Sequence, residues 1–206
     1  MVVIGTGLAG RVIAEALSGP DYSLTGFLYT GDTPPEDFPY PVLGSFEEAE
    51  HFSGRGRGFI VAADSLRNRE AVVRAFPELC YQAVIHPAAY VAADAVVEPG
   101  AYIGAGAIVG AGASIGAHTV IGEGSVVGAM SRIGPYCDLL ARVNIGREVT
   151  VKDHTFIGHS ATLKDSITIA AGTVIQTGEI VVKDMVMKMV YKRGAWIYKE
   201  NGPGER

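Results

Sequence analysis

The sequence has few cysteines and no long apolar run. Its 206 residues include only two cysteines, Cys80 and Cys137, in a spacing that matches no metal-binding motif. No stretch approaches the ~20 apolar residues that a membrane-spanning helix needs. Residues 1–4 run directly into a glycine loop without the pattern of a signal peptide. We therefore expect a cytoplasmic protein with reduced thiols and no membrane partner.

An excess of positive charge is also missing. The net charge is −5 at pH 7, which argues against nucleic acid or a membrane surface as a partner. Because 48% of the residues are hydrophobic and 27 are glycine, the chain can still bury a proper core, in one long unit or two smaller ones.

The main positive feature is a period of six. From Ile85 to Val181 every sixth residue is aliphatic, and the residue two positions earlier is small or β-branched, with Glu179 as the exception. A period of six is a multiple of the strand period of two and does not fit a helix. It is the repeat of a parallel β-helix. Glycine often follows the aliphatic residue directly, as at Gly122, and we expect glycine or polar residues to turn the corners.

The region before the repeat has the pattern of a small α/β unit with a parallel sheet. Strands are predicted at 2–4, 24–29 and 59–62, helices at 11–17, 45–51 and 66–76, and an irregular proline-rich stretch at 34–41. The sequence thus predicts a Rossmann-like domain at 1–84, a β-helix domain at 85–187 and a C-terminal cap or tail at 188–206.

A Gly-x-Gly-x-x-Gly motif at residues 5–10 joins the first predicted strand to the first helix. Its backbone N–H groups and the helix N-terminus suit a phosphate. The region provides only one mononucleotide-binding half, so we expect a site for a nucleotide or a nucleotide sugar rather than for NAD. The alternative is that the glycines only allow close strand-to-helix packing. The candidate nucleotide-sugar ligands are Gly5, Thr6, Gly7, Leu8, Gly10, Asp32, Ser65, Arg67 and Asn68.

The two regions together resemble the bacterial sugar acyltransferases with an N-terminal Rossmann-like domain and a left-handed β-helix, relatives of the sialic acid O-acetyltransferases. The resemblance rests on the glycine motif, residues 26–28 with Asp32, residues 59–62 followed by 68–69, residues 85–87 and the repeat. It implies a homotrimer that transfers an acyl group, such as acetyl, from coenzyme A to an amino group of a nucleotide-linked deoxysugar. In that family the nucleotide sugar binds the small domain, and coenzyme A lies along the β-helix between subunits.

The usual catalytic histidine of that family has no counterpart in a gapless alignment from His86. Ala129 falls at its position, Met130 at its acidic neighbour and Asp138 at a second family histidine. An amine acceptor is favoured over a hydroxyl, because an alcohol would suffer more from the missing base.

Three candidate catalytic residues remain: Asp138, Asp94 and His159. The alternative for each is a turn or surface residue without a role in catalysis. Cys137 occupies an inward small position of its hexapeptide, so we expect it to be a buried, inert thiol.

The end of the chain is basic and aromatic. Trp196 could stack on the adenine of acyl-CoA, and Lys192 or Arg193 could pair with its phosphates. Arg147 and Lys183 complete the candidate acyl-CoA ligands. The alternative is that the tail caps the open end of the β-helix.

Two other functions stay open. His118, His154 and His159 are spaced 36 and 5 residues apart, as the zinc ligands of γ-class carbonic anhydrases are. A 36-residue gap spans two coils, about 9.6 Å, which is too far for one zinc within a single chain. The phase also differs from that motif by one residue, so we expect no metal. The other alternative is a nucleotide-sugar-binding trimer with an inactive transferase site.

Overall fold

The computed structural model describes residues 1–20, 22–54, 56–63, 65–188, 190–192 and 195–197. Its first part is a four-stranded parallel sheet in the order β3-β2-β1-β4, with helices on both faces. The elements of this small domain are β1 (Val2–Ile4), α1 (Leu8–Ala16), β2 (Gly26–Tyr29), β3 (Val42–Ser45), the 3-10 helix η1 (Phe46–Phe52), β4 (Phe59–Val61) and α2 (Leu66–Ala75). The order strand, helix, strand around a central β1 is that of one half of a Rossmann-like sheet.

Alternation along the strands divides the small domain into two cores. Phe27 and Ile60 pack toward α1 on one face, whereas Leu28, Phe59 and Val61 pack toward α2 and η1 on the other. Strands buried on both faces are continuous apolar runs, as parallel strands of α/β proteins are.

The structure corrects two sequence predictions for this domain. The first helix begins at Leu8 rather than at residue 11, because Gly7 is the N-cap and the glycine motif already forms the first turn. Strand β3 falls where no strand was predicted. It is an edge strand directly after Pro41, and its register with β2 shifts between Phe27 and Leu28. Short, irregular edge strands leave little pattern in a sequence.

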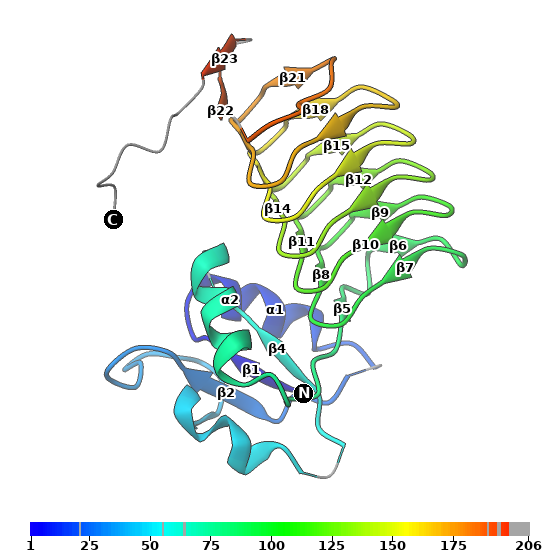
Figure 1. Cartoon of the computed structure of the whole chain (residues 1–206). Helices are drawn as coiled ribbons and strands as arrows, with labels where there is room; N and C mark the ends of the chain where they lie inside the picture. Colours follow the sequence, from blue (N-terminus) through cyan, green and yellow to red (C-terminus); the bar gives the residue numbers. More distant parts are fainter. Residues whose placement is uncertain (21, 55, 64, 189, 193–194, 198–206) are drawn as a thin grey trace.

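The repeat forms a parallel β-helix with three faces (Figure 1). Each short strand pairs in parallel with the strand one coil away, so that Ile121 lies between Ile103 and Leu139. The aliphatic residues from Ile103 to Val181 are at most 2% exposed. This arrangement, with its hexapeptide period, fits a left-handed β-helix.

The strands form three sheets, here called sheets B, C and D. Sheet B contains β5 (Val84–Ile85), β8 (Tyr102–Ile103), β11 (Val120–Ile121), β14 (Asp138–Leu139), β17 (Phe156–Ile157), β20 (Val174–Ile175), β22 (Val190–Lys192) and β23 (Ala195–Ile197). Sheet C contains β6 (Tyr90–Val91), β9 (Ile108–Val109), β12 (Val126–Val127), β15 (Asn144–Ile145), β18 (Thr162–Leu163) and β21 (Ile180–Val181). Sheet D contains β7 (Val96–Val97), β10 (Ser114–Ile115), β13 (Arg132–Ile133), β16 (Thr150–Val151) and β19 (Thr168–Ile169).

The corners hold glycine or polar residues, as expected, with Met130 as an apolar exception. The residue with left-handed φ is the third after the aliphatic residue, as at Gly124 (φ 64°) and His118 (φ 56°). The glycine directly after the aliphatic residue has another purpose. A Cβ at Gly122 would lie 2.6 Å from the carbonyl carbon of Leu140 in the next coil, so close approach between coils explains that glycine.

Buried hydroxyls link successive coils inside the β-helix. The Oγ of Ser125 accepts a hydrogen bond from the N–H of Val143 (3.0 Å) and donates one to the carbonyl of Leu140 (2.8 Å). Thr119 and Ser131 make the equivalent contacts in their own coils. The small inward position therefore carries a satisfied polar ladder as well as alanine.

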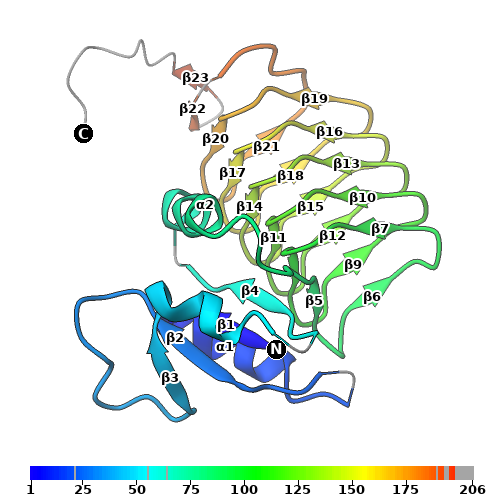
Figure 2. The ribbon, with the colours of Figure 1, turned by 60° about the horizontal axis from the view of Figure 1, so that its bottom comes forward.

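The two ends of the β-helix have different neighbours (Figures 1 and 2). The small domain lies at the first coils. At the other end β22 adds in parallel to β20, and β23 pairs antiparallel with β22. Tyr191 of β22 is buried in the core of the β-helix, which agrees with a capping role for the tail.

The exact domain boundaries stay predictions. Among the described residues, no helix is both long and apolar enough to cross a bilayer.

Candidate functional site

The outer face of sheet B meets the small domain. Val84 and Tyr102 are buried in the same core as Ile13 and Ile60 of the small domain, and Val120 packs against it. One coil further, the register places Asp138 beside Val120. The contact between the domains therefore changes from apolar to charged at β14.

A cavity of about 220 Å³ lies at this change, between the small domain and the β-helix. Leu8 at the start of α1, Ala62 and Ala63 after β4, and Arg69 of α2 line it from the small domain. From the β-helix it is lined by Tyr102, Val120, Gly122, Glu123, Asp138, Leu139, Leu140, Ala141 and His159. Of the three predicted catalytic residues, Asp138 and His159 thus share one cavity.

Arg69 forms a buried ion pair with Asp138 across the domain contact. The side chains are 3% and 14% exposed, and Nη2 of Arg69 donates to Oδ1 of Asp138. Nε of Arg69 is buried without a hydrogen-bond partner in the described structure. The contact with this guanidinium fixes the position of the Asp138 side chain, so Asp138 suits orientation of a ligand.

Glu123, Ala141 and His159 occupy one corner of three successive coils. Each is the second residue after the aliphatic residue of its strand in sheet B. With coils about 4.8 Å apart, Glu123 and His159 are separated by roughly 9.6 Å along this corner. Ala141 between them is small, which leaves room for a ligand group over the middle coil.

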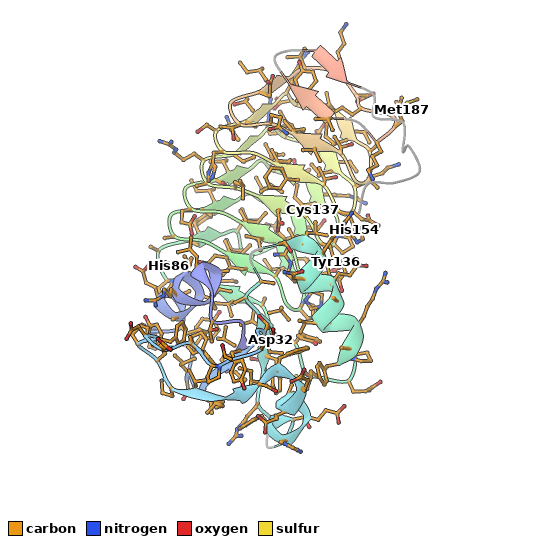
Figure 3. The ribbon with its side chains drawn as sticks, turned by 90° about the vertical axis from the view of Figure 1, so that its left-hand side faces the viewer. Asp32, His86, Tyr136, Cys137, His154 and Met187 are labelled. Atoms are coloured by element: carbon orange, nitrogen blue, oxygen red, sulfur yellow. The ribbon has the colours of Figure 1, made fainter. Side chains whose placement is uncertain are left out.

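A column of aromatic rings stands beside α2 at another corner of the β-helix. The ring of Tyr136 stacks on His118 at 5.2 Å and on His154 at 5.3 Å, and Tyr81 packs edge-on against His118 at 4.9 Å. Figure 3 shows Tyr136 and His154 next to α2, where Nε2 of His154 lies 3.4 Å from a carboxylate oxygen of Glu70. Consecutive residues of α2 therefore contact two coils of the β-helix.

His118 is the buried member of this column. It is 7% exposed, and its Nδ1 has no hydrogen-bond partner in the described structure. Burial, and secondarily the charge of Arg69, lowers the pKa of His118 to about 4. The ring of Tyr136 separates it from His154, so these two histidines cannot meet at one metal ion. Among the described residues no group of three or more His, Cys, Asp or Glu could hold a metal.

A second cavity, of about 460 Å³, lies at the carboxyl edge of the small parallel sheet. Gly7, Thr30 after β2, Ala63 after β4 and Asn68 of α2 line it. This is the edge where ligands bind in open α/β sheets. Ala63 and its neighbour Ala62 line both cavities.

The predicted nucleotide ligands divide into three groups. Gly7 and Asn68 line the second cavity and Leu8 lines the first. Close packing explains Gly5 and Gly10. A Cβ at Gly5 would lie 2.1 Å from the carbonyl oxygen of Ala62, and a Cβ at Gly10 would lie 2.3 Å from the carbonyl oxygen of Gly5.

The remaining predicted nucleotide ligands line neither cavity. Asp32 and Arg67 are exposed and line neither cavity, and Thr6 is partly buried and also lines neither. The hydroxyl of Ser65 caps α2 by accepting the N–H of Asn68 at 3.2 Å.

Other predicted site residues lie elsewhere. Asp94 is an exposed turn residue of the first coil and does not line the cavity. Ala129 follows β12 in sheet C, whereas the cavity lies at sheet B. Cys137 is fully buried, which confirms the prediction of a buried thiol, and burial raises its pKa to about 12, as an inert thiol requires.

The predicted acyl-CoA ligands are described only in part. Arg147 forms a two-pronged contact with Asp165, at 3.2 and 2.9 Å. Lys183 is exposed. Arg193 and the side chains of Lys192 and Trp196 lie outside the described residues.

Sequence reasoning did not single out two charged residues of the cavity. Arg69 is an internal residue of a predicted helix, where charge usually faces solvent, and only the tertiary contact reveals its burial. Glu123 had a weak signal, because its position in neighbouring repeats holds alanine at 105 and 141. A charge that interrupts a small-residue column marks a place where the repeat is modified.

Comparison with known proteins supports the fold. A family model described as the GMPPB C-terminal domain matches residues 79–189, more than half of the chain. The chain belongs to the GMPPB C-terminal domain family. The match covers the β-helix of this family member and leaves the small domain outside. A search of curated proteins found no match.

Several solved structures are similar over nearly the whole chain. PerB from Caulobacter crescentus, in complex with CoA and GDP-perosamine, has a TM-score of 0.83 and 25% identity over 92% of this chain and 91% of that chain. WeeI from Acinetobacter baumannii has a TM-score of 0.77 and 18% identity over 95% and 98%. The acetyltransferase domain of PglB from Neisseria gonorrhoeae has a TM-score of 0.63 and 24% identity over 92% and 94%. The fold of the small domain and β-helix together is thus shared with these solved structures.

Proposed function

We propose that this protein is an acyl-CoA-dependent N-acyltransferase that acts on an amino group of a nucleotide-linked deoxysugar. The observation that carries the proposal is the cavity between the glycine motif and sheet B, in which Arg69, Asp138, Glu123 and His159 meet. The similarity to PerB, solved with CoA and GDP-perosamine, supports the same pair of ligands here.

The two cavities suit two parts of one substrate. The nucleotide would lie at the carboxyl edge of the small sheet, with its phosphates toward Gly7 and the N-terminus of α1. The sugar would reach past Ala62 and Ala63, which line both cavities, to the charged residues of sheet B. A nucleotide sugar therefore fits the arrangement better than a free sugar does.

The reaction needs an amine, a thioester and a proton acceptor. The amine nitrogen attacks the thioester carbonyl carbon and forms the C–N bond, and the C–S bond then breaks to release the thiolate of coenzyme A. His159 is the group we assign to accept the proton of the attacking nitrogen, because it is the histidine that lines the cavity. Protonation of the leaving thiolate completes the balance, with an amide and free coenzyme A as products.

Coenzyme A and a second subunit belong to the same proposal. Exposed Arg147 and Lys183 remain candidates for its phosphates, although Arg147 would have to exchange its contact with Asp165. Tyr90, Ile108 and Ile180 are exposed apolar residues on the outer face of sheet C. A face of this kind supports a homotrimer in which the β-helices pack side by side.

The test measures release of free thiol from acetyl-CoA in the presence of nucleotide-linked amino sugars, GDP-perosamine included. We expect turnover by the wild-type protein, and about 10²–10⁴-fold slower turnover by His159→Asn, the usual range for loss of a general base. Titration with coenzyme A should give the same affinity for both proteins.

His51→Asn is the matched control, since His51 is an exposed histidine of η1 outside the cavity. It should react at the wild-type rate. Sugar binding without thiol release by the wild-type protein would instead favour the inactive binding protein, and unchanged turnover by His159→Asn would remove His159 from the mechanism.

A further inference from the structure

The two carboxylates of the cavity differ in their partners. Asp138 is neutralised by the buried guanidinium of Arg69. Within the described part of the chain, Glu123 has no ion pair with a cationic side chain. Arg142 donates its backbone N–H to the carbonyl of Glu123, but its side chain does not line the cavity. One negative charge is therefore left over at the cavity wall.

The charge of Glu123 acts on the neighbouring side chain of Tyr102. Tyr102 lines the cavity and is 5% exposed. Its pKa is raised above the ordinary value, first by burial and then by the charges of Glu123 and Glu15. The charge of Glu123 therefore acts at this wall, which suits a cationic group and disfavours a phosphate.

The position of Glu123 relative to His159 matches a bound amine. Both side chains belong to one corner of sheet B, with Ala141 on the coil between them. A group that lies over Ala141 is roughly one coil, about 4.8 Å, from each of them. An alkyl ammonium in that place would have a carboxylate on one side and a proton acceptor on the other.

We infer that Glu123 is the specificity-determining residue that binds the acceptor amine in its ammonium form and selects amino sugars over hydroxyl sugars. This inference rests on the proposed function and names the feature of the substrate that the cavity recognises. The ammonium binds beside Glu123 and gives its proton to His159, and the neutral nitrogen then attacks the thioester. A hydroxyl sugar has no charge for Glu123 and gains nothing from it.

The test compares binding of two ligands that differ in one group. GDP-perosamine and the analogue with a hydroxyl in place of the amino group are titrated into the protein without coenzyme A, together with matched pairs that carry UDP or dTDP. For the pair that binds, we expect the amine to bind about fivefold more tightly than the hydroxyl sugar, the upper end of the range for a charge pair with an exposed carboxylate. Glu123→Gln should reduce this preference to within about twofold, through loss of affinity for the amine alone.

Glu15→Gln is the matched control. Glu15 is an exposed carboxylate of α1 that also influences Tyr102, yet it does not line the cavity. It should keep the full preference. Equal affinity of the wild-type protein for both sugars, no binding of any pair, or an unchanged preference in Glu123→Gln would each overturn the inference.

Thiol release separates this inference from the proposed function. A wild-type protein that prefers the amine through Glu123 but releases no thiol sustains the inference, while transfer as the function of the protein fails. A protein that transfers acetyl groups with the same selectivity in Glu123→Gln sustains the function and refutes the role of Glu123.

Discussion

The interior of the β-helix and the outer face of sheet B follow different rules. Inside, one aliphatic residue per hexapeptide recurs from coil to coil, and from Ile103 onward these residues are at most 2% exposed. Outside, the residues that precede them in sheet B change from coil to coil. They are Val84, Tyr102, Val120, Asp138, Phe156 and Val174.

The inward residues determine the fold, whereas the outward residues of sheet B form the site. A coil can stack on any neighbour as long as its inward residues repeat, so the interior keeps its period. The outer residues are free to vary, and they differ where the small domain meets them. Apolar outer residues fasten the small domain, and the single charged one, Asp138, lies where the cavity opens.

Removal of the ion pair between Arg69 and Asp138 should cause the largest loss of stability on the outer face of sheet B. Arg69→Met leaves Asp138 without its cation at a mostly buried position, and such a change costs about 3–5 kcal/mol. We expect that loss in the free energy of unfolding by urea denaturation. The double variant Arg69→Met/Asp138→Leu should recover most of it, because no uncompensated charge remains.

Arg74→Met is the control on the same helix. The side chain of Arg74 is 78% exposed and pairs with Glu70 at the surface. The stability of the Arg74→Met variant should therefore stay close to that of the wild-type protein. Equal stability of Arg69→Met and Arg74→Met would show that the Arg69–Asp138 contact does not fasten α2 to the β-helix.

The pattern of the sequence was sufficient for the interior and insufficient for the contact between the domains. The anchors at Ile121 or Ile157 could be predicted because period and burial coincide. The contact of Arg69 with Asp138 joins residues 69 positions apart, and neither position has a local pattern that points to the other. Glu123 and His159 line one cavity because they occupy the same corner of the β-helix two coils apart.

A decrease in pH should lower the stability of the protein through His118, the buried histidine in the column of rings beside α2. Its pKa is about 4 in the folded protein and about 6.5 in an unfolded chain. The unfolded state then binds the proton first, so stability is complete above pH 6.5 and falls as the pH drops toward 4. The expected loss over this window is about 3 kcal/mol.

Urea denaturation between pH 7 and pH 4 would measure this dependence. His118→Asn should lose that part of it, and asparagine accepts the left-handed conformation at this corner. His51→Asn, at an exposed position, should keep the wild-type profile. The assignment to His118 would be wrong if both variants followed the wild-type curve.

The smallest effect is expected from a conservative change inside the β-helix. Ile121 is fully buried, and Ile121→Val removes one methylene group from the repeat at a cost of about 1 kcal/mol. The adjacent outer residue Val120 is unchanged, so the cavity keeps its lining and the proposed acyl transfer should proceed at the wild-type rate. Urea denaturation and thiol release measured on the same preparation check both halves of this expectation. Lost turnover with unchanged stability would mean that the interior residues tune the site directly, and the separation between the two regions would fail.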